Sequence, residues 1–339
     1  MGIQAIIPKL KTQDTIVFNY SLFTNEDKLI LAPMQNLTSL FFRKTFSQFF
    51  PSNIDYAVSP FISVSSNNQN PDSIQYKDIL PKENENLMPL VPQILGNKPD
   101  EILECAKIIE RLGYREINLN MGCPKKDIVS HKRGAGLLRE KELITQIFET
   151  VFDNTALQLS IKVRLGINSP QDLDNIIPIL NAFPLKSVCI HPRTQIQQYG
   201  GSADFEAFGY FASKLKHTVI YNGDIFSASD FAALKSRFPD IKHWMIGRGL
   251  LQNPFLCADI RGIYYNKKDT LSLYLNQLQE NFVKSLHHYN EITVLNKMKE
   301  FVKYISSGYG FDATELLRKS SLNDFNQQLN RILSDISQR

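Results

Sequence analysis

Eight short β-rich runs, alternating with stretches of helical length, constrain the fold of this chain more than any other feature. The runs occupy residues 28–34, 54–60, 88–95, 115–122, 158–166, 187–193, 218–225 and 243–250. Between several of them, as at 99–113 and 172–183, apolar residues recur at three- and four-residue spacing, which predicts amphipathic helices. Repeated βα units over roughly 230 residues are typical of a TIM barrel. An open doubly wound sheet is the competing fold, but no GxGxxG motif follows the first run.

Beyond residue 260 the strand signals end, and four helical patterns follow. They cover residues 271–289, 293–310, 313–321 and 322–336. We therefore predict an α/β protein, a TIM (β/α)8 barrel followed by a small C-terminal helical bundle. The expected division is an N-terminal extension at 1–27, a catalytic barrel domain at 28–260 and a helical domain at 261–339. The extension has no clear periodicity, and the sequence leaves open whether it forms a hairpin or a cap over the lower end of the barrel.

Composition is that of an ordinary globular protein of 339 residues, with 43% hydrophobic and 21% charged residues. The four cysteines, Cys105, Cys123, Cys189 and Cys257, form no CxxC pair, so we expect no metal site and no disulfide framework, and a reducing cytoplasm fits best. No apolar run has the length of a membrane span, so we expect no membrane role. The net charge of +4 permits a polyanionic partner without requiring one.

Polar residues or glycines follow nearly every predicted strand, where a purely structural strand would not need them. They are Met34, Gln35, Gln93, Asn120, Cys123, Lys162, Arg164, His191, Arg193, Asn222, Gly223, Asp224, Gly247 and Arg248. A barrel gathers the carboxyl ends of its strands in one ring. A single residue of this set could be a satisfied core group, but coincidence across seven strands is improbable, and we interpret the set as one site.

The two glycine-containing segments that end the last strands indicate a phosphate-bearing cofactor. Segments 222–224 (NGD) and 247–249 (GRG) offer backbone N–H groups and the guanidinium of Arg248, at the place where barrels often bind phosphate. Flavin mononucleotide (FMN) fits such a socket. Lys162 would be a costly charge inside a barrel unless it faced an anion, such as a reduced flavin, or paired with a neighbouring carboxylate.

Cys123 stands at the end of a strand, between Gly122 and Pro124, and a basic loop follows it. A free cysteine often only fills a core, but a thiol at this end of a barrel strand can serve as a general acid. The loop contains Lys125, Lys126, His131, Lys132 and Arg133. These residues either form a positive patch at the mouth of the site or are a solvated loop.

The ordered motifs of the barrel resemble those of the tRNA-dihydrouridine synthases. The resemblance rests on APM at 32–34, QILG at 93–96, NMGCP at 120–124, GAGLL at 134–138, KVR at 162–164, HPRT at 191–194, QYGGSAD at 198–204, NGD at 222–224 and IGRGLLQNP at 246–254. It covers about 220 residues of the barrel, and the helical tail is similar to the family's RNA-binding bundle. The turn MQNLTS at 34–39 departs from the family, which usually has a smaller residue and a glycine after the methionine, and the N-terminal extension is longer than in many relatives.

This resemblance implies an FMN-dependent reduction of the C5–C6 double bond of uridine in the tRNA D-loop, with NADPH or less often NADH as reductant. Hydride would reach C6, and the Cys123 thiol, mostly protonated at neutral pH, would donate a proton to C5. The implied FMN ligands are Pro33, Met34, Gln35, Gln93, Lys162, His191, Asn222, Gly223, Asp224, Gly247 and Arg248. The implied RNA contacts are Asn120, Arg164, Arg193, Lys125, Lys126, Lys132 and Arg133, with His191 also near the uracil. We expect a monomer that selects an extruded base through the helical domain and the basic loop.

Two other functions stay open at this point. One is a flavin barrel with a small-molecule substrate, as in dihydroorotate or ene-type oxidoreductases, which would need neither the basic loop nor the helical tail. The other is a tRNA-binding protein without catalysis, against which Cys123, Lys162 and the NGD and GRG segments argue. The sequence indicates neither the target uridine nor the tRNA set, and it does not address ribosomal RNA.

Overall fold

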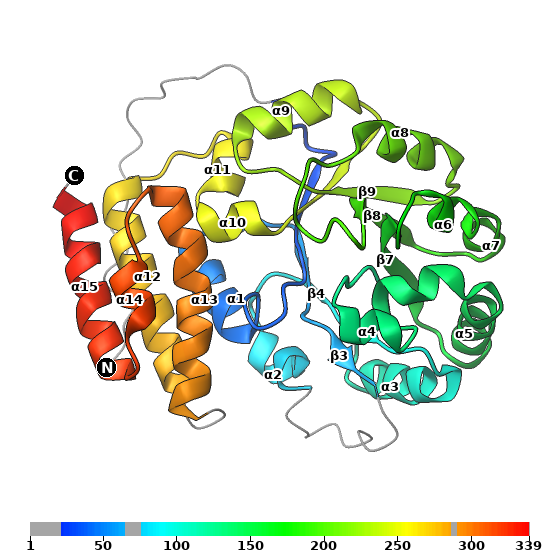
Figure 1. Cartoon of the computed structure of the whole chain (residues 1–339), viewed down its shortest axis with the longest axis horizontal. Helices are drawn as coiled ribbons and strands as arrows, with labels where there is room; N and C mark the ends of the chain where they lie inside the picture. The colour runs from blue at the N-terminus through cyan, green and yellow to red at the C-terminus, as the bar shows by residue number, and fades with distance from the viewer. Residues whose placement is uncertain (1–21, 65–75, 286–289, 339) are drawn as a thin grey trace.

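The computed structural model describes residues 22–64, 76–285 and 290–338, and in them the chain forms a parallel β-barrel with helices around it (Figure 1). The strands are β1 (Lys28–Leu31), β2 (Tyr56–Val58), β3 (Ile62–Ser63), β4 (Leu90–Val91), β5 (Gln93–Leu95), β6 (Glu116–Met121), β7 (Gln158–Gly166), β8 (Ser187–Thr194), β9 (Thr218–Asn222) and β10 (His243–Ile246). Their order in the sheet is β3-β5-β6-β7-β8-β9-β10-β1-β2-β4. Each of these pairings is parallel.

The two ends of this order meet, because β3 continues the course of β2 and β5 continues that of β4. Pro92, which has no N–H to donate, separates β4 from β5. Each interrupted pair counts as one barrel strand, so the ring has the eight strands that the sequence predicts. The predicted TIM-barrel fold is confirmed. Two predicted strands differ in detail, since 88–95 is split at Pro92 and 54–60 ends at Val58, before the short strand β3.

Helices connect the strands on the outside of the barrel. They are α1 (Leu40–Phe49), α2 (Pro81–Asn84), α3 (Pro99–Arg111), α4 (Lys126–Ser130), α5 (Lys141–Asn154), α6 (Gln171–Asp174), α7 (Ile177–Ala182), α8 (Phe205–Lys214), α9 (Ala228–Arg237), α10 (Arg248–Gln252) and α11 (Leu256–Arg261), with 3-10 turns at Lys77–Ile79 and Gly134–Arg139. Sequence signals explain several boundaries: Pro99 opens α3, and Ser227 and Asp230 form a capping box at α9. The predicted helix 172–183 is divided into α6 and α7, with Pro178 in the first turn of α7.

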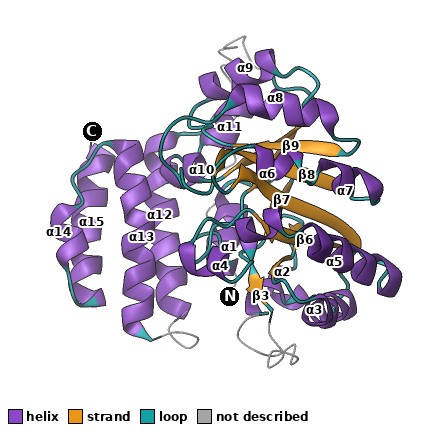
Figure 2. Ribbon diagram, turned by 45° about the vertical axis from the view of Figure 1, so that its right-hand side comes forward, coloured by secondary structure: helices purple, strands orange, loops and turns teal. Residues whose placement is uncertain are grey.

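Four helices follow the barrel: α12 (Lys267–Lys284), α13 (Glu291–Tyr309), α14 (Thr314–Arg318) and α15 (Leu322–Gln338). They stand beside the barrel as one group, with α12 and α13 nearer to it than α15 (Figure 2). Rings from α1 contact this group, since the Phe42 and Phe301 centroids are 6.0 Å apart and those of Phe49 and Tyr274 are 5.8 Å apart. No helix among the described residues is both long enough and apolar enough to cross a membrane.

A buried ion pair joins the segment before β1 to the lower part of the barrel. The Asp27 carboxylate accepts hydrogen bonds from Lys235 Nζ at 2.5 Å, Trp244 Nε1 at 3.2 Å and the hydroxyl of Thr24 at 2.8 Å. Burial alone would raise the pKa of Asp27, but these hydrogen bonds outweigh burial and lower it. Most of the predicted extension 1–27 lies outside the described residues, so the choice between hairpin and cap stays open.

Replacing Asp27 by Asn should destabilise the protein, because it leaves the buried Lys235 ammonium without a counter-charge. Breaking a buried pair from one side typically costs about 3–5 kcal/mol. Urea unfolding followed by circular dichroism measures the change in the free energy of unfolding. The matched control is Glu26→Gln, because Glu26 is 74% exposed and pairs with Lys242 at the surface. That control should cost less than about 1 kcal/mol. Equal losses in both variants would contradict a structural role for the buried pair.

Candidate active site

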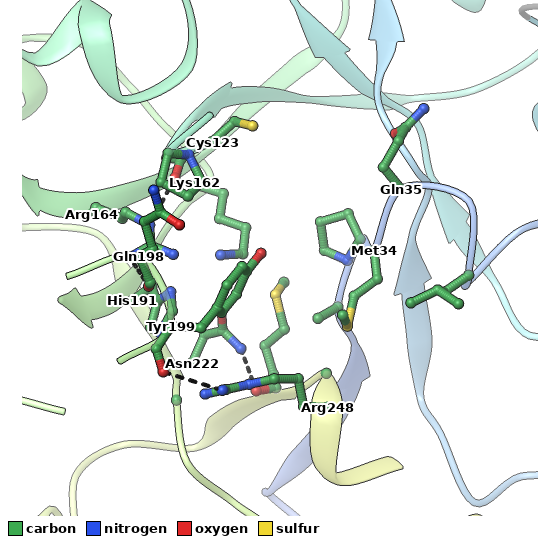
Figure 3. Close-up of a pocket in the computed structure, with 18 of the residues that line it drawn as sticks. Met34, Gln35, Cys123, Lys162, Arg164, His191, Gln198, Tyr199, Asn222 and Arg248 are labelled. Atoms are coloured by element: carbon green, nitrogen blue, oxygen red, sulfur yellow. Dashed lines mark hydrogen bonds between the residues drawn. The ribbon is translucent and has the colours of Figure 1, made fainter. Parts of the chain in front are cut away.

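A cavity of about 530 Å³ opens at the carboxyl ends of the barrel strands (Figure 3). Its wall comes from residues in or after β1, β2, β6, β7, β8, β9 and β10, and from α13. Sites for small ligands and cofactors usually measure about 300–1,000 Å³ and lie at this end of a TIM barrel. The cavity is therefore the candidate active site.

A network of buried polar side chains links the three neighbouring strands β5, β6 and β7. Asn118 Nδ2 donates to Ser160 Oγ at 3.0 Å, and Gln93 Nε2 donates to Asn118 Oδ1 at 2.7 Å. Asn120 Nδ2 in turn donates to Gln93 Oε1 at 2.8 Å. Gln93 is fully buried, and each link satisfies groups that have no access to water. This network of hydrogen bonds therefore fixes the orientation of the Asn120 amide.

The Asn120 amide determines the turn that presents Cys123. Its Oδ1 accepts hydrogen bonds from the backbone N–H of Gly122 at 3.1 Å and of Cys123 at 2.9 Å. On the other side, the N–H of Ala135 donates to the Cys123 carbonyl at 3.1 Å. Gly134, with φ of +55°, allows the backbone to come this close to Cys123, because a Cβ there would lie 2.8 Å from the same carbonyl oxygen. The thiol is thus held from both sides at the cavity wall.

Burial raises the pKa of the Cys123 thiol above its ordinary value. A backbone hydrogen bond from Lys125 and the charges of Lys125 and Arg164 act in the opposite direction but are smaller. The thiol is therefore protonated at neutral pH, which is the state that a proton donor requires.

Lys162 extends from β7 into the cavity (Figure 3). Within the described part of the chain it makes no hydrogen bond and no ion pair, so the carboxylate partner considered as an alternative is not found there. Loss of hydration, followed by the charge of Arg164, lowers the pKa of Lys162. An ammonium group without a partner, directed into a cavity, is suited to an anionic ligand.

His191 is neutral at the cavity wall. Burial, and then the positive charges of Arg164, Lys162 and Arg193, lower its pKa well below the ordinary value. Its Nε2 lies 3.2 Å from a guanidinium nitrogen of Arg193. Because arginine can only donate, Nε2 is the acceptor and the ring proton is on Nδ1.

Three arginines hold the loop at residues 194–201 by its backbone carbonyls. Arg164, Arg193 and Arg248 donate to carbonyl oxygens of this loop at 2.6–3.4 Å. The guanidinium carbons of Arg164 and Arg248 lie 5.4 and 5.1 Å from the ring centroid of Tyr199. Cation–π contacts at these distances keep the half-exposed Tyr199 ring beside the cavity (Figure 3).

The far end of the cavity combines positive charge with free backbone donors. The N–H groups of Gly223, Asp224 and Gly247 donate to no acceptor within the described part of the chain. Arg248 is partly exposed there and pairs with Asp224 at 3.0 Å, while Asp224 also accepts two hydrogen bonds from Arg193. Free N–H groups beside a guanidinium fit the phosphate of a cofactor. In the described residues no cluster of His, Cys, Asp and Glu is suited to a metal ion.

Known proteins of one family are similar in sequence to this chain. The sequence model of the dihydrouridine synthase family (Dus) matches residues 30–338. The chain belongs to the dihydrouridine synthase family. A probable tRNA-dihydrouridine synthase of Rickettsia typhi is 32% identical over 243 residues, which are 70% of this chain and 71% of the relative. A tRNA-dihydrouridine(16) synthase of Neisseria meningitidis is 30% identical over 251 residues, 70% and 73% of the two chains.

Solved structures support the fold of this dihydrouridine synthase family member. The old yellow enzyme of Trypanosoma cruzi superposes with a TM-score of 0.51 and 10% identity, over 75% of this chain and 93% of that enzyme. At such low identity the likeness shows a common barrel fold.

Most of the residues that the sequence predicted for the site line the cavity of this family member. They are Pro33, Met34, Gln35, Asn120, Cys123, Lys125, Lys126, Lys162, Arg164, His191, Asn222, Gly223, Asp224, Gly247 and Arg248. Their proximity agrees with the prediction of a single site. The role of each residue in binding or catalysis stays a prediction.

Four predicted residues lie elsewhere. Gln93 and Arg193 are buried behind the cavity wall, where their hydrogen bonds support neighbouring residues. Lys132 pairs with Glu140 at 2.9 Å, and Arg133 donates to an Asn97 side chain. The basic loop is thereby divided, because only Lys125 and Lys126 of its cations reach the cavity.

Sequence reasoning assigned no role to several other residues of the cavity wall. They are Phe61, Gln198, Tyr199, Phe226, Glu300 and Tyr304. Tyr199 lies inside the QYGGSAD motif, so that motif was an available signal. Glu300 and Tyr304 come from α13, and their four-residue spacing was the only local sign that they share a face.

Alkylation of Cys123 should be slow at neutral pH and accelerate as pH rises, because only the thiolate reacts and the raised pKa delays its formation. Iodoacetamide labelling between pH 6 and pH 11, read by mass spectrometry, gives the midpoint. We expect it above about 8.5, the usual value for a free thiol. Cys189 is the internal control, since it is buried and should stay unlabelled in the folded protein. A midpoint below that of free cysteine would contradict burial as the dominant influence.

Proposed function

We propose that this protein reduces uridine in the D-loop of tRNA to 5,6-dihydrouridine, with bound FMN and with NADPH, or less often NADH, as reductant. The observation that carries the proposal is the protonated Cys123 thiol, held by Asn120 at the wall of a cavity into which Lys162 projects. Family membership supports the same reaction. The proposal includes a barrel at 28–260 that performs the reaction in the cytoplasm and helices at 261–339 that bind tRNA.

The residues present fit FMN at the inner end of the cavity. Gly223, Asp224, Gly247 and Arg248 would hold its phosphate, and Met34, Lys162, His191 and Asn222 would surround the ring system. Bound there, the reduced flavin would supply a hydride for C6 of the uracil ring. Lys162 would favour the anionic reduced form through the positive charge of its ammonium group.

The chain's own residues complete the reduction. Hydride addition at C6 places negative charge on C5 and O4 of the uracil, and Cys123 donates its proton to C5. The thiolate that remains takes a proton from water. The cationic donors Lys162 and Arg164 face the same cavity and would stabilise the charge on the carbonyl oxygen as it develops. Asn120 would act mainly through the turn that it holds, because its oxygen already accepts two hydrogen bonds.

The Cys123→Ala variant tests the function. It should bind FMN and be reduced by NADPH, but dihydrouridine formation should fall about 10²–10⁴-fold, the usual contribution of a general acid. Single-turnover oxidation of the reduced flavin by unmodified tRNA, with detection of dihydrouridine in the product, measures this step. The control is Cys105→Ala, which removes a thiol that is buried in the core away from the cavity. The function would be refuted if the wild-type protein bound no flavin. It would also be refuted if unmodified tRNA did not oxidise the reduced flavin of the wild-type protein. A wild-type rate in Cys123→Ala would refute only the proton donor.

The divided basic loop gives a second test. Lys125→Ala with Lys126→Ala should weaken tRNA binding. The slope of the logarithm of the binding constant against the logarithm of the salt concentration should become less steep by about 0.7–0.9 for each phosphate contact that is lost. Lys132→Ala with Arg133→Ala removes the same charge from residues that already have protein partners, and it should have a smaller effect. Binding isotherms at several salt concentrations make the comparison. Equal effects of the two double variants would show that the whole loop contacts RNA, and no effect of either would show a merely solvated loop.

A further inference from the structure

Helix α13 contributes two side chains to the wall of the catalytic cavity. Glu300 and Tyr304 line it together with Tyr199 and Arg248, although they follow the last barrel strand by some fifty residues. Both side chains are partly exposed. The helical part of the chain is therefore a component of the site itself.

Packing determines which face of α13 meets the cavity. Glu300, Tyr304 and Gly308 are four residues apart and share one face of the helix. A Cβ at Gly308 would lie 2.1 Å from the Gln252 carbonyl oxygen, so only glycine allows this close approach to α10. Phe301 and other apolar residues bury another face of the helix, and a third face, with Asn296 and Lys303, is exposed. Because α10 begins at Arg248, this contact holds Glu300 and Tyr304 beside the proposed phosphate end.

Glu300 places a negative charge in a cavity whose wall is mostly positively charged. The cations of the wall are Lys125, Lys126, Lys162, Arg164 and Arg248. Of the carboxylates there, Asp224 pairs with two arginines and Asp127 is exposed at the mouth. Glu300 makes no hydrogen bond and no ion pair within the described residues.

A carboxylate beside an RNA-binding cavity weakens binding through repulsion of phosphate groups, unless it accepts a hydrogen bond from the bound nucleotide. A uridine nucleotide offers two such donors, the N3–H of its base and the 2′-hydroxyl of its ribose. Tyr304, whose pKa is raised by burial and then by Tyr199 and Glu300, keeps a neutral phenol beside this carboxylate.

We infer that Glu300 is a substrate-binding residue that accepts a hydrogen bond from the target uridine nucleotide, and that α13 thereby takes part in substrate selection. This inference rests on the proposed function. Both candidate partners of Glu300, the N3–H of the base and the 2′-hydroxyl of the ribose, are uncharged hydrogen-bond donors, unlike the phosphate.

The sign of one mutational effect decides between this role and simple charge balance. If Glu300 accepts a hydrogen bond, Glu300→Ala should lower the single-turnover kcat/KM for RNA about ten- to hundredfold, the usual cost of a lost base contact. Glu300→Gln, which keeps an acceptor oxygen, should lose less. If Glu300 only repels phosphate, both variants should bind RNA more tightly. Glu315→Gln is the matched control, because Glu315 is exposed on α14 outside the cavity wall and loses the same charge.

Modified substrates identify the donor. Wild type and Glu300→Ala are compared on RNA that carries either 2′-deoxyuridine or 3-methyluridine at the target position. The penalty of Glu300→Ala should disappear on the substrate that lacks the bonded donor, and persist on the other. A penalty that persists equally on both substrates, or an increase in RNA affinity of Glu300→Ala, overturns the inference. Failure of the wild type to reduce uridine in any RNA would instead refute the proposed function, so the two failures are distinguishable.

Discussion

The hydrogen bond from the Cys123 backbone to the Asn120 side chain is the interaction on which the geometry of the site depends. Asn120 is itself oriented by Gln93, and Gln93 by Asn118, so the thiol is connected to the centre of the barrel by buried amide groups. Removing one member would leave its buried neighbours unsatisfied, at a cost of about 1–3 kcal/mol each. The proposed role of Cys123 as a proton donor would need such rigid support, because a small displacement of the thiol would misplace its proton.

Electrostatics around the cavity follow from an excess of cations over free carboxylates. Asp224 pairs with Arg193 and Arg248, which themselves donate to the loop at 194–201. Lys162 makes no hydrogen bond or ion pair among the described residues. Burial, and then the same positive charges, lower the pKa of His191 and keep it neutral. A cavity with this balance attracts anions, and both a flavin phosphate and an RNA backbone are anionic. Tyr199, between Arg164 and Arg248, adds a flat ring at its edge.

The sequence predicted the barrel well because short β-rich runs alternate regularly with helical stretches; the run at 158–166 coincides with β7. It did not predict the break at Pro92 or the short strand β3, since these depend on how the ring closes. For the site, the sequence showed at the end of which strand each polar residue lies. It could not show that Gln93 and Arg193 turn away from the cavity, because their hydrogen-bond partners lie on other strands and loops.

The contribution of α13 was beyond local sequence patterns for a similar reason. Nothing near Glu300 in the sequence points to the barrel. The close approach of Gly308 to Gln252 and the contact of Phe301 with Phe42 bring α13 to it. Contacts from lysines and arginines to phosphate supply affinity for any RNA, but they carry no information about the base. Discrimination must come from donors and acceptors inside the cavity. In the proposed function, a helix outside the barrel that places a carboxylate there would therefore link the binding of RNA to the choice of nucleotide.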